Sequence, residues 1–333
     1  MIDFLQQWFS DNWRPEFGAA RPGSIRLVKT ASSGAGLRHK ERESKIFFMA
    51  FSARATRPFA VAKIPRFQHG LATLRREYGT LSEVAACEAL APTFADTVPS
   101  PLYFGEIGPE TVSVQTAVHG RMVRGARGRA ADREYGRVFA MARQWQRGMA
   151  PFAASGGVTL TGEHIHNWFV QPLDVINRAT RMAGVQAPDM LRDILHEADA
   201  LQGQAVTAVA QHGDFTVSNV CVEGAALRVF DFEHFAIENN PLFDVIWFAR
   251  SLWHASCGPE WIESPAASAV LKQAAADILG ERAHELARPL FTQALLKSFA
   301  RKFAFLGATA DAAGSMVPPY LREMEALRGV FAA

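Results

Sequence analysis

The sequence predicts an α+β fold in two parts, the first built mainly on strands and the second mainly on helices. Short strand-like runs occupy residues 25–118, whereas apolar residues recur at helical spacing from about Asp132 onward. A chain of 333 residues is too long for one small core and suits one two-lobed unit or two domains. We therefore predict a smaller N-terminal lobe over residues 1–118 and a larger helical lobe over residues 119–333.

The composition is that of an ordinary globular protein, with 49% apolar and 20% charged residues. A formal net charge of +2 gives no strong attraction to nucleic acid or to a membrane surface, so we expect neither as a partner. Asp3 and the lack of a basic region before an apolar run argue against a signal peptide. Three cysteines without paired spacing predict reduced thiols and a cytoplasmic protein.

The first expected element is a short amphipathic helix within residues 1–23 that packs on the following lobe. Its apolar residues at helical spacing are Phe4, Leu5, Trp8 and Phe9, and Pro15 and Pro22 end it. Strands are then predicted over residues 24–30 and around residues 45–51, because both runs are rich in apolar and β-branched or aromatic side chains.

A loop of small residues separates these two strands and includes Ser33, Gly34 and Gly36. Kinase nucleotide loops are built in this way, because small residues let backbone N–H groups approach phosphate oxygens. An ordinary hairpin turn uses the same residues and is the alternative. No Gly-x-x-x-x-Gly-Lys-Ser/Thr motif occurs, which disfavours a Walker-type site.

A third strand is predicted over residues 58–64, where alternation sends Val61 and Lys63 to the same face. Val-Ala-Lys matches the kinase strand whose lysine contacts the α- and β-phosphates, although a solvated edge-strand lysine fits as well. Glu77 follows 14 residues later (77 − 63) in an amphipathic helix over residues 71–81. It lies beside the apolar face, so it can turn toward Lys63 or pair at the surface.

The chemistry-bearing stretch begins at a His-Gly-Asp run, and residues 220–230 after it predict a β-hairpin. Asp214 precedes the first strand, Asn219 lies at its start, and Asp231 ends the second strand 12 residues later (231 − 219). One carboxylate that can accept a hydroxyl proton, beside an Asn and an Asp that can hold Mg²⁺, is what phosphoryl transfer requires. The alternative is two acidic turns flanking an ordinary hairpin.

His-Gly-Asp-x-x-x-x-Asn at residues 212–219, with Asp-Phe-Glu at residues 231–233, resembles the aminoglycoside phosphotransferase and choline kinase group of small-molecule kinases. The resemblance spans roughly residues 25–250. It implies a bilobal protein-kinase-like fold, with a small antiparallel-sheet N-terminal lobe and a larger, mostly helical C-terminal lobe. It also implies that strands end in a hinge near Gly120.

The resemblance further implies transfer of the γ-phosphoryl group of ATP or GTP to a hydroxyl of a small-molecule acceptor. Asp214 would be the catalytic base, and Asn219 and Asp231 would hold Mg²⁺. The implied nucleotide-binding residues are Ser33, Gly34, Gly36, Lys63, Glu77, Thr116 through its C=O and Val118 through its N–H. The implied supporting residues are His212, Glu233 and Asp244.

Spacing and charge favour a small acceptor. Only 13 residues separate Asp231 from Asp244 (244 − 231) and no Ala-Pro-Glu follows, so there is no room for a peptide-holding activation segment. Residues 251–333 hold eight acidic and eight basic residues, which gives no support for a polycationic aminoglycoside. A sugar-like or other neutral or anionic metabolite fits as well or better. A catalytically silent nucleotide-binding module and an aminoglycoside antibiotic phosphotransferase are the alternatives.

Two further features have more than one interpretation. Residues 121–147 hold eight arginines, which form either a patch for an anionic partner or a solvated helix face. His164 and His166 could lie on one side of a strand as zinc ligands do, but no third ligand is evident nearby.

The remaining expected elements are helical. A helix from Pro188 to about Val209 would lead to the His-Gly-Asp run, and another would open after residues 239–241. Residues 262–333 predict further helices, with breaks at Gly307 and at Pro318-Pro319.

Overall fold

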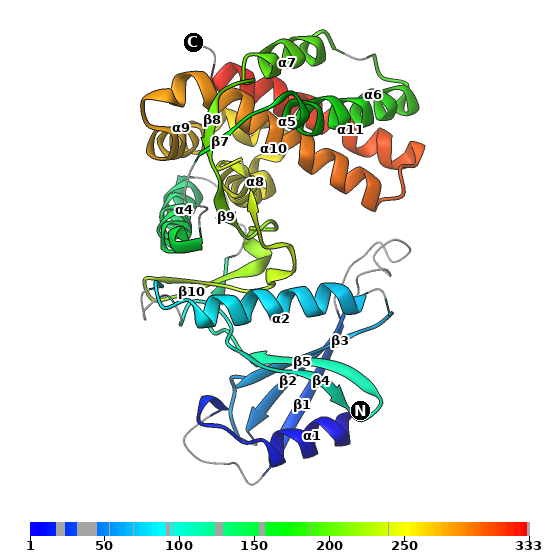
Figure 1. Cartoon of the computed structure of the whole chain (residues 1–333), viewed down its shortest axis with the longest axis vertical. Coiled ribbons are helices and arrows are strands. Elements are labelled where there is room, and N and C mark those ends of the chain that lie inside the picture. Colours follow the sequence, from blue (N-terminus) through cyan, green and yellow to red (C-terminus); the bar gives the residue numbers. More distant parts are fainter. Residues whose placement is uncertain are drawn as a thin grey trace. The chain divides into compact units, whose positions relative to one another are not determined.

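Two compact units make up the part of the chain that the structure describes (Figure 1). The computed structural model describes residues 1–17, 24–31, 45–52, 54–68, 70–90, 94, 96–123, 129–152, 157–186, 188–238 and 240–331. The first unit comprises residues 1–122 and 219–235, and the second comprises residues 123–218 and 236–333. The hairpin that we placed in the C-terminal lobe therefore groups with the first unit.

The first unit is built on a five-stranded antiparallel sheet in the order β1-β2-β3-β5-β4. Its strands are β1 (Ile25–Ala31), β2 (Lys45–Ser52), β3 (Ala60–Pro65), β4 (Pro101–Ile107) and β5 (Glu110–Thr116). Each strand contains alternating apolar residues, which is why one face of the sheet is largely buried. The register places Phe47 opposite Lys63 and Val61 opposite Gln115.

Two helices, α1 (Ile2–Asp11) and α2 (Gly70–Ala86), pack on opposite faces of this sheet (Figure 1). Leu5 and Phe9 of α1 share a buried core with Ala62 and Ile64 of β3, as the helical spacing predicted. Lys63 lies between those two residues, so the pleat sends it to the other face, where α2 lies. This alternation brings a lysine from the sheet to the helix that carries Glu77.

The predicted hairpin pairs β10 (Val220–Glu223) with β11 (Ala226–Val229), and β10 also pairs with β6 (Arg121–Met122). Gly120 precedes β6 with φ +148°, and a Cβ there would lie 2.9 Å from Cys221 Sγ. Glycine therefore lets the chain pass closely along the hairpin. At the open end, Phe230 N–H donates to Asn219 C=O at 3.0 Å, which holds Asn219 and Asp231 at the same end.

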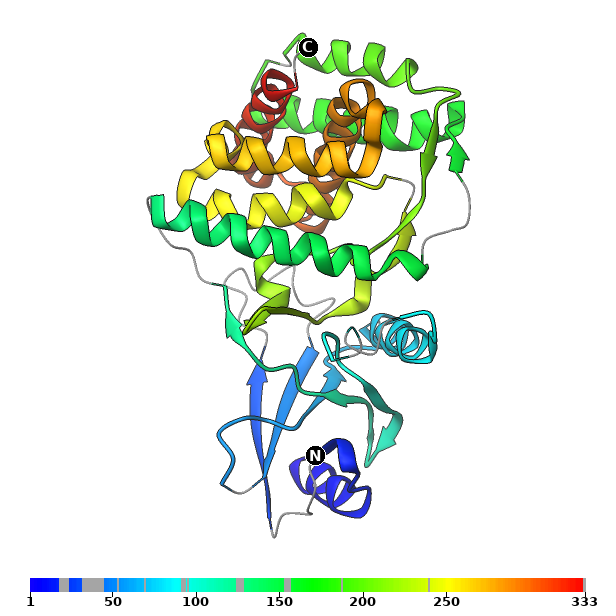
Figure 2. The ribbon, with the colours of Figure 1, turned by 90° about the vertical axis from the view of Figure 1, so that its left-hand side faces the viewer.

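The second unit is mostly helical. Its α-helices are α4 (Arg129–Gly148), α5 (Gly162–Ile165), α6 (Gln171–Ala183), α7 (Met190–Asp199), α8 (Phe243–Cys257), α9 (Pro265–Leu279), α10 (Ala283–Phe305) and α11 (Ala310–Val330). Its strand pairs are β7 (Gly157–Thr159) with β8 (Ala205–Thr207), and β9 (Val209–Gln211) with β12 (Ala236–Glu238). Helices α4, α8 and α9 lie side by side (Figure 2). No helix in the described ranges is long and apolar enough to cross a bilayer.

The expected strand at residues 164–166 is wrong, because these residues lie in α5 and in a π-helical turn (His166–Val170). Thr161 begins the helix: its hydroxyl accepts the backbone N–H of His164, and the His164 ring accepts the Thr161 N–H in return. This reciprocal cap outweighs the strand pattern. Over the described residues, no group of three or more His, Cys, Asp or Glu could hold a metal ion, so the zinc alternative finds no support there.

The helix expected from Pro188 to about Val209 is shorter than predicted. It ends at Asp199, and Gly203, with φ +83°, then turns the chain into β8. The chain reaches the His-Gly-Asp run through β9, which pairs with β12.

Pro318 and Pro319 lie inside α11 and do not break it. Helix α11 buries Met316, Val317 and Tyr320 around these prolines. We infer that this packing outweighs the backbone hydrogen bonds that the two prolines remove. The break predicted at Gly307 is confirmed, since Gly307 has φ +84° between α10 and α11.

Candidate active site

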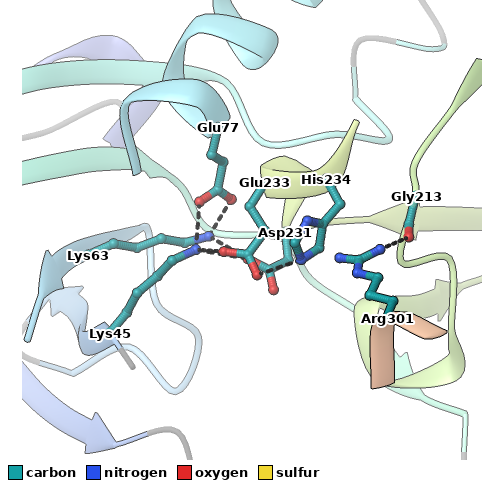
Figure 3. Close-up of polar contacts among 8 residues, drawn as sticks. All are labelled: Lys45, Lys63, Glu77, Gly213, Asp231, Glu233, His234 and Arg301. Atoms are coloured by element: carbon teal, nitrogen blue, oxygen red, sulfur yellow. Dashed lines mark hydrogen bonds and ion pairs between the residues drawn. The ribbon is translucent and has the colours of Figure 1, made fainter. Parts of the chain in front are cut away.

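Lys63 and Glu77 form a buried ion pair in the first unit (Figure 3). Lys63 Nζ donates to Glu77 Oε1 and lies 3.4 Å from Asp231 Oδ1, just beyond the end of β11. The side chains of Lys63 and Glu77 are only 4% and 1% exposed. Strand β3, helix α2 and the hairpin therefore meet at one lysine, and the surface-pairing alternative for Glu77 is not what the structure shows.

A second lysine, Lys45, joins this pair and was not anticipated as a site residue. Lys45 Nζ contacts Glu233 Oε2 and lies 3.4 Å from Glu77 Oε2 and 3.5 Å from Asp231 Oδ1. Figure 3 shows both lysine side chains directed toward Glu77. The strand register could have indicated Lys45: it shares a strand face with Phe47, which lies opposite Lys63.

The electrostatics of this cluster favour a charged Lys45. Burial lowers the pKa of Lys45, but the charges of Glu77, Asp231 and Glu233 outweigh burial, so the pKa is raised above its ordinary value. Burial and the charge of Asp231 raise the pKa of Glu233, against the lowering effect of Lys45. Two lysines face three carboxylates, so the fully ionised cluster has one excess negative charge that an added cation could offset.

We expect Lys45→Met to lower the free energy of unfolding by about 3 kcal/mol, because it leaves buried carboxylates with less compensating charge. The raised pKa keeps Lys45 protonated at neutral pH, so the stabilisation is fully present there and is lost only as pH rises through that pKa. Urea denaturation at neutral pH measures the change. Lys29→Met, at an exposed position of β1, is the control. Equal stability of the two variants would contradict this role for Lys45.

A cavity of about 420 Å³ opens beside the cluster within the first unit. Its walls are mostly apolar, and its lining residues include Phe47, Met49, Val61, Met122, Cys221 and Phe230. The segment from Thr116 to Val118 forms one side, and Lys63, Asn219 and Asp231 also line it. An apolar space with a few polar groups is typical of a small-molecule site, and the volume suits a nucleotide base.

Gln115 of β5 forms part of the cavity wall. The residue is only 4% exposed, and its buried Oε1 has no hydrogen-bond partner in the described part of the chain. A buried acceptor without a donor costs about 1–3 kcal/mol. The protein covers this oxygen, so Gln115 shapes the wall of the cavity.

Asn219 and Asp231 fit a hard cation. Asn219 is buried, and both residues offer oxygen donors at the open end of the hairpin, the donor type that Mg²⁺ prefers. Asp231 has φ +72°, an uncommon conformation for a residue other than glycine. Such a backbone conformation costs roughly 1–3 kcal/mol and is found preferentially at functional sites.

The turn at residues 212–217 carries Asp214 in the second unit. Buried Asp244 accepts the backbone N–H groups of His212 and Gly213, the latter at 3.0 Å, as expected of a supporting acid. Phe215 anchors the turn through stacked contacts with Trp145 and Phe248, at ring-centre distances of 5.3 and 4.6 Å. The turn is thus fixed from both sides, with Asp214 partly exposed.

The predicted site residues therefore fall into two sets. The first unit holds Lys63, Glu77, Thr116, Val118, Asn219, Asp231 and Glu233, and the second holds His212, Asp214 and Asp244. Ser33, Gly34 and Gly36 of the predicted nucleotide loop lie outside the described residues.

A family model described as the phosphotransferase enzyme family matches residues 50–288. Among solved structures, a choline kinase from Cryptosporidium parvum Iowa II is 10% identical over 99% of this chain and 98% of its own, with a TM-score of 0.56. An ethanolamine kinase from Plasmodium vivax is 10% identical over 91% and 81%, with a TM-score of 0.54. A thermostable mutant of the aminoglycoside phosphotransferase APH(4)-Ia is 14% identical over 92% and 96%, with a TM-score of 0.53. These similarities confirm the predicted fold class. No curated protein is similar enough in sequence to match this chain.

Proposed function

Because this chain belongs to the phosphotransferase enzyme family, we propose that it is a kinase for a small hydroxyl compound. The phosphoryl donor is ATP or GTP. The acceptor is a sugar-like or other metabolite, and the enzyme acts in the cytoplasm.

The observation that carries this proposal is the cluster of Lys63, Glu77 and Asp231 at the wall of an apolar cavity. Lys63 is directed by Glu77 and binds the α- and β-phosphates of the nucleotide. The base lies in the cavity, and the backbone groups of Thr116 and Val118 hold its edge.

Asp214 is the proposed base for the transfer. The acceptor hydroxyl gives its proton to Asp214 as its oxygen bonds to the γ-phosphorus, and the bond from that phosphorus to the bridging oxygen breaks, which releases the nucleoside diphosphate. Asp244 holds the turn, so Asp214 keeps one orientation during turnover. His212 is buried at the start of the same turn and supports it.

Asn219 and Asp231 would hold Mg²⁺ through their side-chain oxygens. The ion supplies positive charge that neutralises the charge developing on the transferring phosphoryl group. Glu233, paired with Lys45, keeps a further negative charge beside Asp231.

The test is a screen for Mg²⁺-dependent release of ADP across sugars, sugar acids, amino alcohols and aminoglycosides, each measured with ATP and with GTP. Acceptor-dependent ADP release that disappears when Mg²⁺ is chelated supports the proposal. Binding of Mg·ATP without release for any acceptor would favour a catalytically silent nucleotide-binding module. The best turnover on an aminoglycoside would make the chain an antibiotic phosphotransferase.

A further inference from the structure

The helices that contact the turn at residues 212–217 bring positive charge close to Asp214. Asp244 and Ser251 of α8 accept backbone N–H groups of the turn. From α10, Arg301 Nη1 donates to the carbonyl oxygen of Gly213 at 3.0 Å (Figure 3). Gly213 directly precedes Asp214 in the sequence, so the guanidinium lies beside the proposed base.

Arg301 is one of four cationic residues that we call the basic cluster: Arg250 on α8, and Lys297, Arg301 and Lys302 on α10. Lys297 lies one helical turn before Arg301, hence on the same face of α10, and its ammonium is 4.8 Å from the ring centre of Phe243. Lys302 follows Arg301 directly in α10, and burial and then the charge of Arg250 lower its pKa.

Besides the proposed base Asp214, the carboxylates near the basic cluster have partners within the protein. Glu323 of α11 is fully buried and accepts Arg250 Nε through both oxygens, at 3.1 and 2.9 Å. The others nearby are Asp244, held by the turn, Asp132, which accepts Trp253 Nε1 at 3.1 Å, and Glu260, which lies 3.8 Å from Arg322. An ammonium group placed here would meet cations and would find these carboxylates engaged.

The guanidinium of Arg301, in contrast, has N–H groups that a bound ligand could accept. Its bond to Gly213 uses one N–H, and in the described part of the chain the rest of its guanidinium has no protein partner. A guanidinium presents several N–H donors in a rigid planar arrangement that suits carboxylate and phosphate oxygens. An anion bound there would be held one residue from Asp214.

We propose that the acceptor is itself an anion: a hydroxyl compound with a carboxylate or phosphate group, which Arg301 binds while the hydroxyl lies at Asp214. Lys297 and Lys302 add attraction to the same group. This inference rests on the proposed function and narrows its acceptor to a charge class.

The test uses matched acceptors that differ only in charge: a neutral hexose, the same hexose with a carboxylate, with a phosphate, and with an amine. Each is titrated with Mg²⁺ and a non-hydrolysable ATP analogue to measure binding, and with Mg·ATP to measure turnover. We expect at least one anionic form to bind about tenfold to a hundredfold more tightly than the neutral form, as an ionic hydrogen bond allows. The carboxylate and phosphate arms identify which anion is preferred.

Variants of Arg301 separate anion binding from support of the turn. Arg301→Gln should raise KM for the anionic acceptor about tenfold or more and leave KM for the neutral one unchanged, whereas loss of a purely structural bond would lower kcat for both. Arg301→Lys should restore part of the preference, because it keeps the charge. Arg192→Gln, at an exposed position of α7, is the control and should change neither constant.

This inference is overturned if no anionic hexose binds more tightly than the neutral hexose. It is also overturned if the amine-bearing hexose binds most tightly of the four. Neither result affects the proposed function, which fails only if no Mg²⁺-dependent phosphoryl transfer occurs with any acceptor of the wider screen.

Discussion

Asp214→Asn is expected to lower kcat by about two to four orders of magnitude, the contribution of a general base, while Mg·ATP affinity stays nearly unchanged. The amide has the size of the carboxylate but cannot take the hydroxyl proton. The contacts that hold the turn come from Asp244, Phe215 and Arg301 and do not require the Asp214 carboxylate, so we expect the fold to persist. Steady-state kinetics with the best acceptor and a nucleotide titration measure the two effects.

The control is Asp199→Asn, at an exposed position at the end of α7, which should leave kcat unchanged. Thermal unfolding of both variants shows whether any loss of activity reflects loss of structure. Full activity of Asp214→Asn would remove Asp214 from the mechanism, and a parallel loss of nucleotide binding would assign it to the nucleotide site.

Much of the first unit follows from local sequence patterns. The alternation that separates Lys63 from Ala62 and Ile64 predicted both a strand and the face of the lysine, and the structure places Glu77 against it. The hairpin at residues 220–230 followed from two apolar runs around a tight turn, and Gly224 with φ +60° forms that turn. These patterns involve residues that are close together in the sequence, and secondary structure is most predictable from such local patterns.

Features that depend on tertiary context were not predictable in the same way. Lys45 is the first residue of its strand, a position where a lysine is commonly solvated. Only the pairing of β2 with β3 brings it to Glu233 and Glu77. The ion pair between Glu323 and Arg250 depends on how α11 packs near α8. A count of charged residues along the sequence cannot show that this carboxylate is already paired. Equal numbers of acidic and basic residues after residue 250 therefore did not show that Arg301 offers N–H donors beside Asp214.

Lys63 and Lys45 share two carboxylate partners, Glu77 and Asp231. Lys63 lies between Glu77 and Asp231, whereas Lys45 contacts Glu233 and lies near the same two carboxylates. Removing one carboxylate therefore leaves each lysine with another partner. Because the ion pairs persist, the effect of the substitution on nucleotide binding can be measured separately from its effect on folding. Asp231 is the acid to remove, because it is 26% exposed and lines the cavity, while Glu77 is buried.

Asp231→Ala is expected to abolish the Mg²⁺-dependent part of ATP binding and to lower turnover by roughly two to three orders of magnitude, as loss of a key electrostatic group does. Asn219 alone offers one neutral oxygen, which is too weak a donor set to hold Mg²⁺ on the nucleotide. Lys63 and Lys45 keep Glu77 and Glu233, so metal-free ATP should bind at least as well as in the unchanged protein.

Calorimetric titration of ATP with and without Mg²⁺ measures both effects, and Asp3→Ala, at an exposed position of α1, is the control. Retention of normal Mg·ATP affinity by Asp231→Ala would mean that the metal is held elsewhere, and the positive φ of Asp231 would then need another explanation.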